Sequence, residues 1–337
     1  MLWSKISVTA VMMAALSYFL GIALIPLLRR YKTGKYQPYV GDRFKTDGSE
    51  PAFGGAVMWM VFAFGSAVAA SYCSGRTGLL MSAVYTLIVT SAGAADDCLL
   101  EVRGKNCGVK TRIKLGLCFV SSLLFLLLAK KTGLAGTAVL LPFGLGIYDL
   151  GAAYCPVMAA VMTAVIYSFR VLNRFGTDED TCIGGLAQTV CFVSMLGLSA
   201  VGTIAKRDML TVMGAVGAAA AAGSLLWGLS PSKLRSGSSG GFFCGALMAS
   251  AAVLCDIYML AGLLLCGAAF IDAVSAVVNY AVYRSRKKLI MRGAVLHKHI
   301  SMFKINDYKV IMIYSAAALA FAAAAAALVV YGEKHYF

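Results

Sequence analysis

Long apolar stretches recur along almost the whole chain, and they are the feature that most limits what it can fold into. The sequence is 60% hydrophobic and only 13% charged, with a mean hydropathy of +0.80. A transmembrane helix needs roughly 20 consecutive, mainly apolar residues. Ten stretches fit this length, although the eighth is short: 7–28, 52–72, 77–96, 113–130, 154–172, 183–203, 208–228, 240–255, 257–283 and 310–331.

This pattern predicts an all-α integral membrane protein with about ten transmembrane helices, in a single multi-pass membrane domain over residues 1–337. Residues 134–149 are also apolar, but Pro142, three glycines and Asp149 interrupt them. Proline and glycine disfavour a helix at such positions. We therefore expect a re-entrant or amphipathic external segment there.

The basic residues predict the orientation of these helices. With the N-terminus outside, 23 of the 30 Lys and Arg residues fall in five cytoplasmic loops, as the positive-inside rule requires. The net charge of +15 is therefore mainly topological. It is a poor indication of nucleic-acid binding, because it is spread over short loops with no domain that could present a groove. The loops expected to form the active face are 29–51, 97–114, 170–182, 229–239 and 284–309.

Two adjacent carboxylates, Asp96 and Asp97, end the third apolar stretch, and a basic loop containing Lys114 follows. Adjacent carboxylates repel each other in a low-dielectric setting, so they are most stable beside a divalent metal ion or beside Lys and Arg. A solvated helix end is the alternative. The basic loop is suited to bind the phosphates of an anionic substrate or, alternatively, lipid headgroups.

Three consecutive acids, Asp178 to Asp180, follow the fifth stretch and Asn173 on the same predicted face. Acidic loops that face each other suit Mg²⁺, which takes one or two carboxylates and keeps water or substrate phosphate as its other ligands. The ninth stretch carries Asp272, an acid that is costly in lipid and is expected to face the bundle interior.

Two glycine-containing segments and a histidine cluster complete the candidate site. Gly54 and Gly55 allow close backbone approach, either to a neighbouring helix or to a phosphate. The Gly- and Ser-rich loop 229–239 either presents N–H groups to an anion at the next helix or is a flexible connector. The run from His297 to His299, with Lys298 between, is typical of a phosphate clamp.

At these positions the chain resembles the phospho-N-acetylmuramoyl-pentapeptide transferase (MraY) family, of the polyprenyl-phosphate N-acetylhexosamine-1-phosphate transferase superfamily. The likeness covers most of the 337 residues. In the last cytoplasmic loop, Lys298 replaces the middle histidine of the family's cluster. The other similar segments are Asp96-Asp97 through Lys114, Pro51-Ala-Phe-Gly-Gly55, Asn173 with Gly185-Leu-Ala187, and Phe270-Ile-Asp272-Ala.

Two departures from the family pattern concern the metal and the nucleotide. Between Asn173 and Gly185 the chain is five residues longer, so either Asp178 or Asp180 supplies the usual acid. Ser238 stands where the family has a Mg²⁺-binding Asp, and a hydroxyl is a weak substitute for a carboxylate. Arg235 stands where the family has a Phe that stacks on uracil, and a guanidinium can also stack on a base.

The resemblance implies a phosphoglycosyl transferase of the bacterial cell membrane that uses Mg²⁺. It would transfer a phospho-amino sugar of the phospho-MurNAc-pentapeptide type from a UDP-sugar to a polyprenyl phosphate and release UMP, the first membrane step of peptidoglycan-type cell-wall synthesis. The resemblance also implies a possible homodimer. The implied catalytic residues are Asp96, Asp97, Asp178 and Asp180; the metal ligands are Asp97 with Asp178 or Asp180; and the substrate-binding residues are Lys45, Lys114, Asn173, Arg235, His297, Lys298 and His299.

Two other functions are compatible with the sequence. The first is a catalytically impaired paralogue that binds lipid phosphate or nucleotide sugar, or that scaffolds envelope enzymes, and Ser238 is the residue in its favour. The second is a secondary transporter. Transporters bury their ionisable groups near the membrane midplane, often with inverted repeats, whereas Asp272 is the one acid expected in mid-span here.

Overall fold

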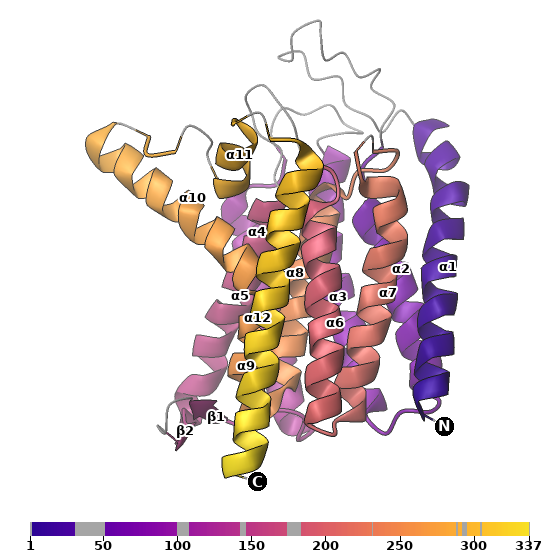
Figure 1. Ribbon diagram of the computed structural model, residues 1–337, viewed down its shortest axis with the longest axis vertical. Coiled ribbons are helices and arrows are strands. Elements are labelled where there is room, and N and C mark those ends of the chain that lie inside the picture. Colours follow the sequence, from indigo (N-terminus) through magenta and orange to yellow (C-terminus); the bar gives the residue numbers. More distant parts are fainter. Residues whose placement is uncertain are drawn as a thin grey trace, which may run out of the picture.

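The computed structural model describes residues 2–30, 51–99, 108–141, 146–173, 183–230, 232–287, 289–291, 295–303 and 305–336. The long helices of these ranges run roughly parallel in one bundle (Figure 1). The elements are α1 (Leu2–Arg30), α2 (Gly54–Ala69), α3 (Arg76–Asp97), α4 (Thr111–Lys131), β1 (Ala138–Leu141), β2 (Gly146–Asp149), η3 (Gly151–Ala153), α5 (Tyr154–Leu172), α6 (Leu186–Ile204), α7 (Asp208–Gly228), α8 (Gly237–Leu254), η4 (Asp256–Tyr258), α9 (Met259–Leu264), α10 (Gly267–Arg286), α11 (Leu296–Ser301) and α12 (Asp307–His335).

The predicted fold class is confirmed, because the described chain is an apolar helical bundle. Eight of its helices are long and apolar enough to cross a membrane, and the bent pair Asp256–Leu264 with Gly267–Arg286 makes a ninth if it is one span. The apolar helix α2 has 16 residues and falls below that length. Each of the ten expected stretches coincides with one of these helices or with the bent pair.

The positions of the termini agree with an even number of crossings. Both lie at one end of the bundle, and α11 lies at the opposite end (Figure 1). Helices α3 and α5 end, and α8 begins, at the α11 end. The described helix ends that border the loops assigned to the cytoplasm by charge counting therefore lie at one end of the molecule, while the outside location of the N-terminus stays a prediction.

The segment 134–149 differs in form from the expected re-entrant or amphipathic segment. It contains two short antiparallel strands, in which Ala138 pairs with Asp149 and Leu141 with Gly146. This hairpin lies at the end of the bundle that holds the termini (Figure 1). Its Val139 and Leu140 are buried, so the apolar residues that resemble a span cover the end of the bundle instead.

Helix α8 occupies the centre of the bundle. Every residue of α8 except Ser238 is buried, as expected for a helix that carries small or apolar residues on all sides. Its glycines and alanines let α2, α3 and α5 approach closely. A Cβ atom on Gly55 of α2 would overlap with the backbone of Ser239. Close packing around α8 thus brings three helix ends to its N-terminus.

Candidate functional site

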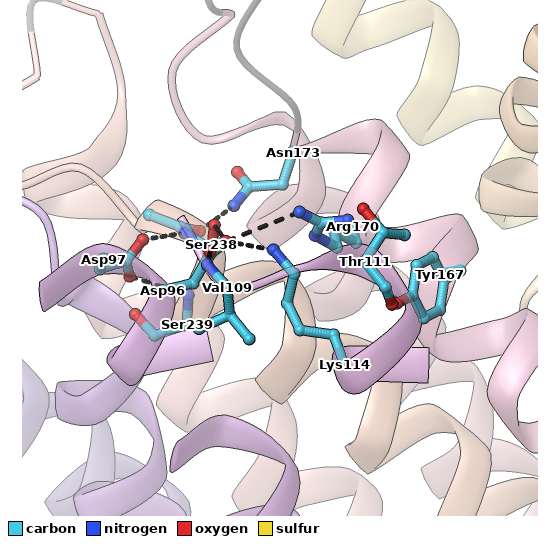
Figure 2. Close-up of polar contacts among 11 residues, drawn as sticks. Asp96, Asp97, Val109, Thr111, Lys114, Tyr167, Arg170, Asn173, Ser238 and Ser239 are labelled. Atoms are coloured by element: carbon cyan, nitrogen blue, oxygen red, sulfur yellow. Dashed lines mark hydrogen bonds and ion pairs between the residues drawn. The ribbon is translucent and has the colours of Figure 1, made fainter. Parts of the chain in front are cut away.

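The two carboxylates at the end of α3 are both buried beside the start of α8 (Figure 2). Asp96 is 2% exposed, and its Oδ2 accepts a hydrogen bond from Lys114 Nζ at 2.7 Å. The Ser238 hydroxyl donates to the same oxygen at 3.0 Å. The backbone N–H of Val109 donates to Asp96 Oδ1 at 2.9 Å. A cation and two neutral donors therefore hold Asp96 in place.

Asp97 binds the N-terminus of α8. Its Oδ1 accepts the backbone N–H of Ser238 at 2.7 Å, and its Oδ2 accepts the N–H of Ser239 at 2.9 Å. The first N–H groups of a helix have no partner within the helix, and the helix dipole favours negative charge there. Of the two alternatives for loop 229–239, N–H groups presented to an anion are the one present, and the anion is a carboxylate of the protein itself.

Arg170, near the end of α5, brings a second cation to Asp96. Its Nη2 lies 3.6 Å from Asp96 Oδ2, and the side chain is 26% exposed. The guanidinium carbon lies 5.6 Å from the centre of the Tyr167 ring and 5.4 Å from that of Phe242. An arginine side chain that is already held over aromatic rings loses less conformational freedom when it binds a ligand than one in open solvent. Lys114 and Arg170 together balance the two carboxylates in charge.

Asn173, predicted to contact the nucleotide, joins the end of α5 to the start of α8 (Figure 2). Its Nδ2 donates to the carbonyl of Gly237 at 2.5 Å, and its Oδ1 accepts the Ser236 hydroxyl at 2.7 Å. Both polar ends of the amide are thereby used within the protein. The structure gives Asn173 a role in holding the loop before α8.

The glycine pair at the start of α2 contacts protein backbone. The N–H groups of Gly54 and Gly55 donate to the carbonyls of Arg235 and Ser236 at 3.0 and 3.2 Å. The N–H of Arg235 in turn donates to the carbonyl of Pro51 at 2.9 Å. Of the two alternatives for these glycines, close approach to a neighbouring segment is the one present, and it fixes the backbone of Arg235.

The remaining predicted residues are divided between a second cluster and the undescribed ranges. His297 is 2% exposed, and its Nδ1 lies 2.9 Å from Asp272 Oδ2. Lys298 and His299 follow in α11, where the Nδ1 of His299 has no hydrogen-bond partner within the described ranges. Lys45, Asp178 and Asp180 lie outside the described residues.

The described residues do not form a magnesium site by themselves. Each of the four oxygens of Asp96 and Asp97 already accepts a hydrogen bond. Within the described ranges no three His, Cys, Asp or Glu side chains come close enough to hold a metal ion. Ser238 offers a hydroxyl where a third acid would stand. The binding of Mg²⁺ by Asp97 with Asp178 or Asp180 therefore stays a prediction of the resemblance.

A Ser238→Asp variant tests this view of the metal site. Because Ser238 Oγ lies 3.0 Å from Asp96 Oδ2, the new carboxylate would add repulsion between acids and create a place for a hard cation. We expect a lower melting temperature than wild type without Mg²⁺ and a rise on adding Mg²⁺ that wild type does not show. Equal stabilisation of both proteins by Mg²⁺ would mean that wild type already has a complete site.

Sequence reasoning did not select Arg170, Ser239 or the partner of His297 as site residues. One signal could have identified Arg170. Tyr167, Arg170 and Asn173 are spaced three residues apart, which places them on one side of a helix. Ser239 donates its backbone N–H to Asp97, a group that any residue except proline would supply. The pairing of Asp272 with His297 depends on a tertiary contact between α10 and α11.

Comparison with known proteins places the chain in a family. The family model described as glycosyl transferase family 4 matches residues 79–256, more than half of the chain. Phospho-N-acetylmuramoyl-pentapeptide-transferases are similar to it over most of their length. The protein of Clostridium kluyveri is 25% identical over 87% of this chain and 90% of its own. That of Caldicellulosiruptor bescii is 28% identical over 86% and 87%, and that of Desulfitobacterium hafniense is 24% identical over 94% and 96%.

The matched range contains the elements of the site, from α3 through α8. The buried pair Asp96 and Asp97, the cations beside them and the helix N-terminus they bind therefore all belong to the part that is shared with the family model. The apolar helices make the chain a multi-pass membrane protein, as expected. The resemblance seen in the sequence is confirmed, and the chain belongs to glycosyl transferase family 4.

Proposed function

We propose that this protein transfers a phospho-amino sugar from a UDP-sugar to a polyprenyl phosphate at the cytoplasmic face of a bacterial membrane, in cell-wall synthesis. An oxygen of the polyprenyl phosphate attacks the β-phosphorus of the UDP-sugar. The bond between that phosphorus and the oxygen bridging to the α-phosphate breaks, and UMP leaves. The sugar, phospho-MurNAc-pentapeptide by the names of the relatives, becomes linked to the lipid through a diphosphate.

The observation that carries this proposal is the pairing of Lys114 and Arg170 with Asp96 at the end of the bundle that holds the predicted cytoplasmic loops. Both substrates are anionic, so their approach requires positive charge. Phosphoryl transfer depends mainly on positioning and on stabilising charge at the transferred group. Arg170 is partly exposed, so its guanidinium can donate two N–H groups to a phosphate in a bidentate contact.

The two carboxylates have different roles in this proposal. Asp97 uses both oxygens to hold the first turn of α8, so it positions the backbone around Ser238. Asp96 holds Lys114 and Arg170, and these two cations can turn from the carboxylate to a substrate phosphate as it arrives. The proposal thus assigns the holding and release of the two cations to Asp96 and geometry to Asp97.

The proposal is tested by incubating the purified protein in lipid with UDP-MurNAc-pentapeptide, polyprenyl phosphate and Mg²⁺ and measuring UMP. We expect UMP only when both substrates are present. Omitting polyprenyl phosphate controls for hydrolysis, and an Asp96→Asn variant controls for a contaminating enzyme. No UMP from a folded protein that has both substrates would overturn the proposal.

One observation favours the impaired paralogue as a second candidate. Every carboxylate oxygen of Asp96 and Asp97 is already bonded within the protein, and Ser238 adds no charge. Such a protein would bind UDP-sugar or polyprenyl phosphate without releasing UMP. Calorimetric binding of the UDP-sugar, measured on the same preparation, therefore separates a binding protein from an enzyme and from a protein that does neither.

A further inference from the structure

Helix α10 carries a polar stripe on one buried face. Asp272, Ser275 and Asn279 are three and four residues apart, a spacing that aligns side chains along one side of a helix. Asp272 is fully buried and Asn279 is 2% exposed. Polar side chains of this kind are costly in a membrane protein unless other groups of the protein bind them.

Asp272, the first residue of the stripe, binds both α11 and α12. Asp272 Oδ1 accepts the backbone N–H of His297 at 3.1 Å and the hydroxyl of Tyr314 at 2.7 Å. Asp272 Oδ2 lies 2.9 Å from the Nδ1 of the same histidine. One carboxylate therefore fixes both the backbone and the ring of His297, and ties α11 to α12.

The rest of the stripe binds the chain that leads to α11. Ser275 Oγ accepts the N–H of Leu296 at 3.0 Å. Asn279 Oδ1 accepts the N–H groups of Ile290 and Met291 at 3.1 and 3.3 Å, and its Nδ2 donates to the carbonyl of Met291. These contacts satisfy backbone groups of the last predicted cytoplasmic loop with side chains of a single helix.

The contact with Asp272 determines where the neutral histidine ring carries its proton. A carboxylate only accepts hydrogen bonds, and here the backbone N–H and the Tyr314 O–H are both donors to it. The Nδ1 atom must then carry the proton that it donates to Oδ2. The other ring nitrogen, Nε2, is left without a proton and is the basic atom of the ring.

We propose that Asp272 is a positioning residue for the transfer reaction. It holds His297 in the Nδ1–H form with a basic Nε2, and it fixes α11, which carries Lys298 and His299. His297 thus offers Nε2 in a fixed orientation as the acceptor for the proton of the attacking lipid phosphate, where the sequence suggested a phosphate clamp. The effect on catalysis rests on the proposed function, but the form of the ring does not.

Nitrogen NMR of the histidines tests the proposal in the full-length protein. The chain has three histidines, so ¹⁵N-histidine-labelled protein in lipid bilayers gives a simple spectrum, and His299→Gln and His335→Gln variants assign the signal of His297. In the neutral ring we expect Nδ1 of His297 to be protonated and Nε2 to be unprotonated. A wild-type His297 with the proton on Nε2 would overturn the proposal without any variant.

An Asp272→Asn variant links the ring to catalysis. The amide can donate to Nδ1, so the proton is expected to move to Nε2, and the rate constant for UMP formation is expected to fall by about 100-fold, the usual order for a lost proton acceptor. Tyr314→Phe removes one hydrogen bond to the same carboxylate and is the matched control, expected to keep the Nδ1–H form and most of the rate.

The possible outcomes are separable. A folded Asp272→Asn protein with an unchanged rate would overturn the positioning role, as would an equal loss of rate in Tyr314→Phe with the Nδ1–H form intact. If wild type forms no UMP, the proposed function fails, while the spectrum still decides whether Asp272 fixes the ring of His297.

Discussion

A Lys114→Met variant is expected to lose at least about 100-fold in the rate of UMP formation and about 3 kcal/mol in the free energy of unfolding. The side chains of Lys114 and Asp96 are 4% and 2% exposed, and Lys114 Nζ lies 2.7 Å from Asp96 Oδ2. Removing one partner of such a buried pair leaves an uncompensated charge, which is the costly case. It also removes a cation that is proposed to bind the substrate phosphates. Activity assays and thermal melts of protein in lipid measure the two losses.

The control for this variant is Lys110→Met, which removes an exposed cation next to the start of α4. It is expected to keep wild-type stability and most of the activity. A double variant, Asp96→Asn with Lys114→Met, replaces the charged pair with neutral groups and should recover much of the stability but none of the activity. Recovery of activity in the double variant would contradict the role given to these two residues.

A Gly93→Ala variant is expected to disrupt the site where α3 packs against α8. Gly93 lies on α3 one turn before Asp97, and a Cβ atom there would come within 2.7 Å of Ser239 Cα and 2.8 Å of Ser239 N. That nitrogen donates one of the two backbone hydrogen bonds that Asp97 accepts. The helices must separate, which costs about 1–3 kcal/mol by overpacking and breaks the contact of Asp97 with α8. We expect a lower melting temperature and near-complete loss of UMP formation.

Gly116→Ala is the matched control, because a Cβ atom on this α4 glycine meets nothing within 4 Å. The same chemical change at an exposed helical position is expected to be neutral or slightly stabilising. Wild-type activity in Gly93→Ala would mean that the close approach of α3 to α8 is not needed for function.

Much of the fold could be predicted from hydropathy, because a helix must bond its own backbone in lipid whatever its neighbours are. The expected ranges 77–96 and 208–228 lie within a residue of α3 and α7. The form of 134–149 was not predictable in the same way. A short apolar segment with glycines fits a hairpin or a re-entrant turn equally well, and contacts at the end of the bundle decide between them.

The candidate site was predictable only in part. The spacing of Asp96 and Lys114 placed both at one membrane face, and the structure brings them into contact. The contact between Asp97 and α8, by contrast, joins residues far apart in the sequence through close helix packing. Hydropathy also does not predict the environment of His297. A histidine next to a lysine gives the same sequence pattern whether its ring faces a ligand or, as here, a buried carboxylate.

In the proposed reaction the phosphate moves together with the sugar, so the fate of the β-phosphorus distinguishes it from transfer of the sugar alone. UDP-MurNAc-pentapeptide labelled with ³²P at the β-phosphate is incubated with the protein and polyprenyl phosphate, and the lipid is extracted. We expect ³²P in the lipid fraction in amounts equal to the UMP formed, and far less of both products with Lys114→Met. Sugar in the lipid without ³²P, together with UDP in the water phase, would contradict the proposed reaction, and so would the absence of any labelled lipid from folded wild-type protein.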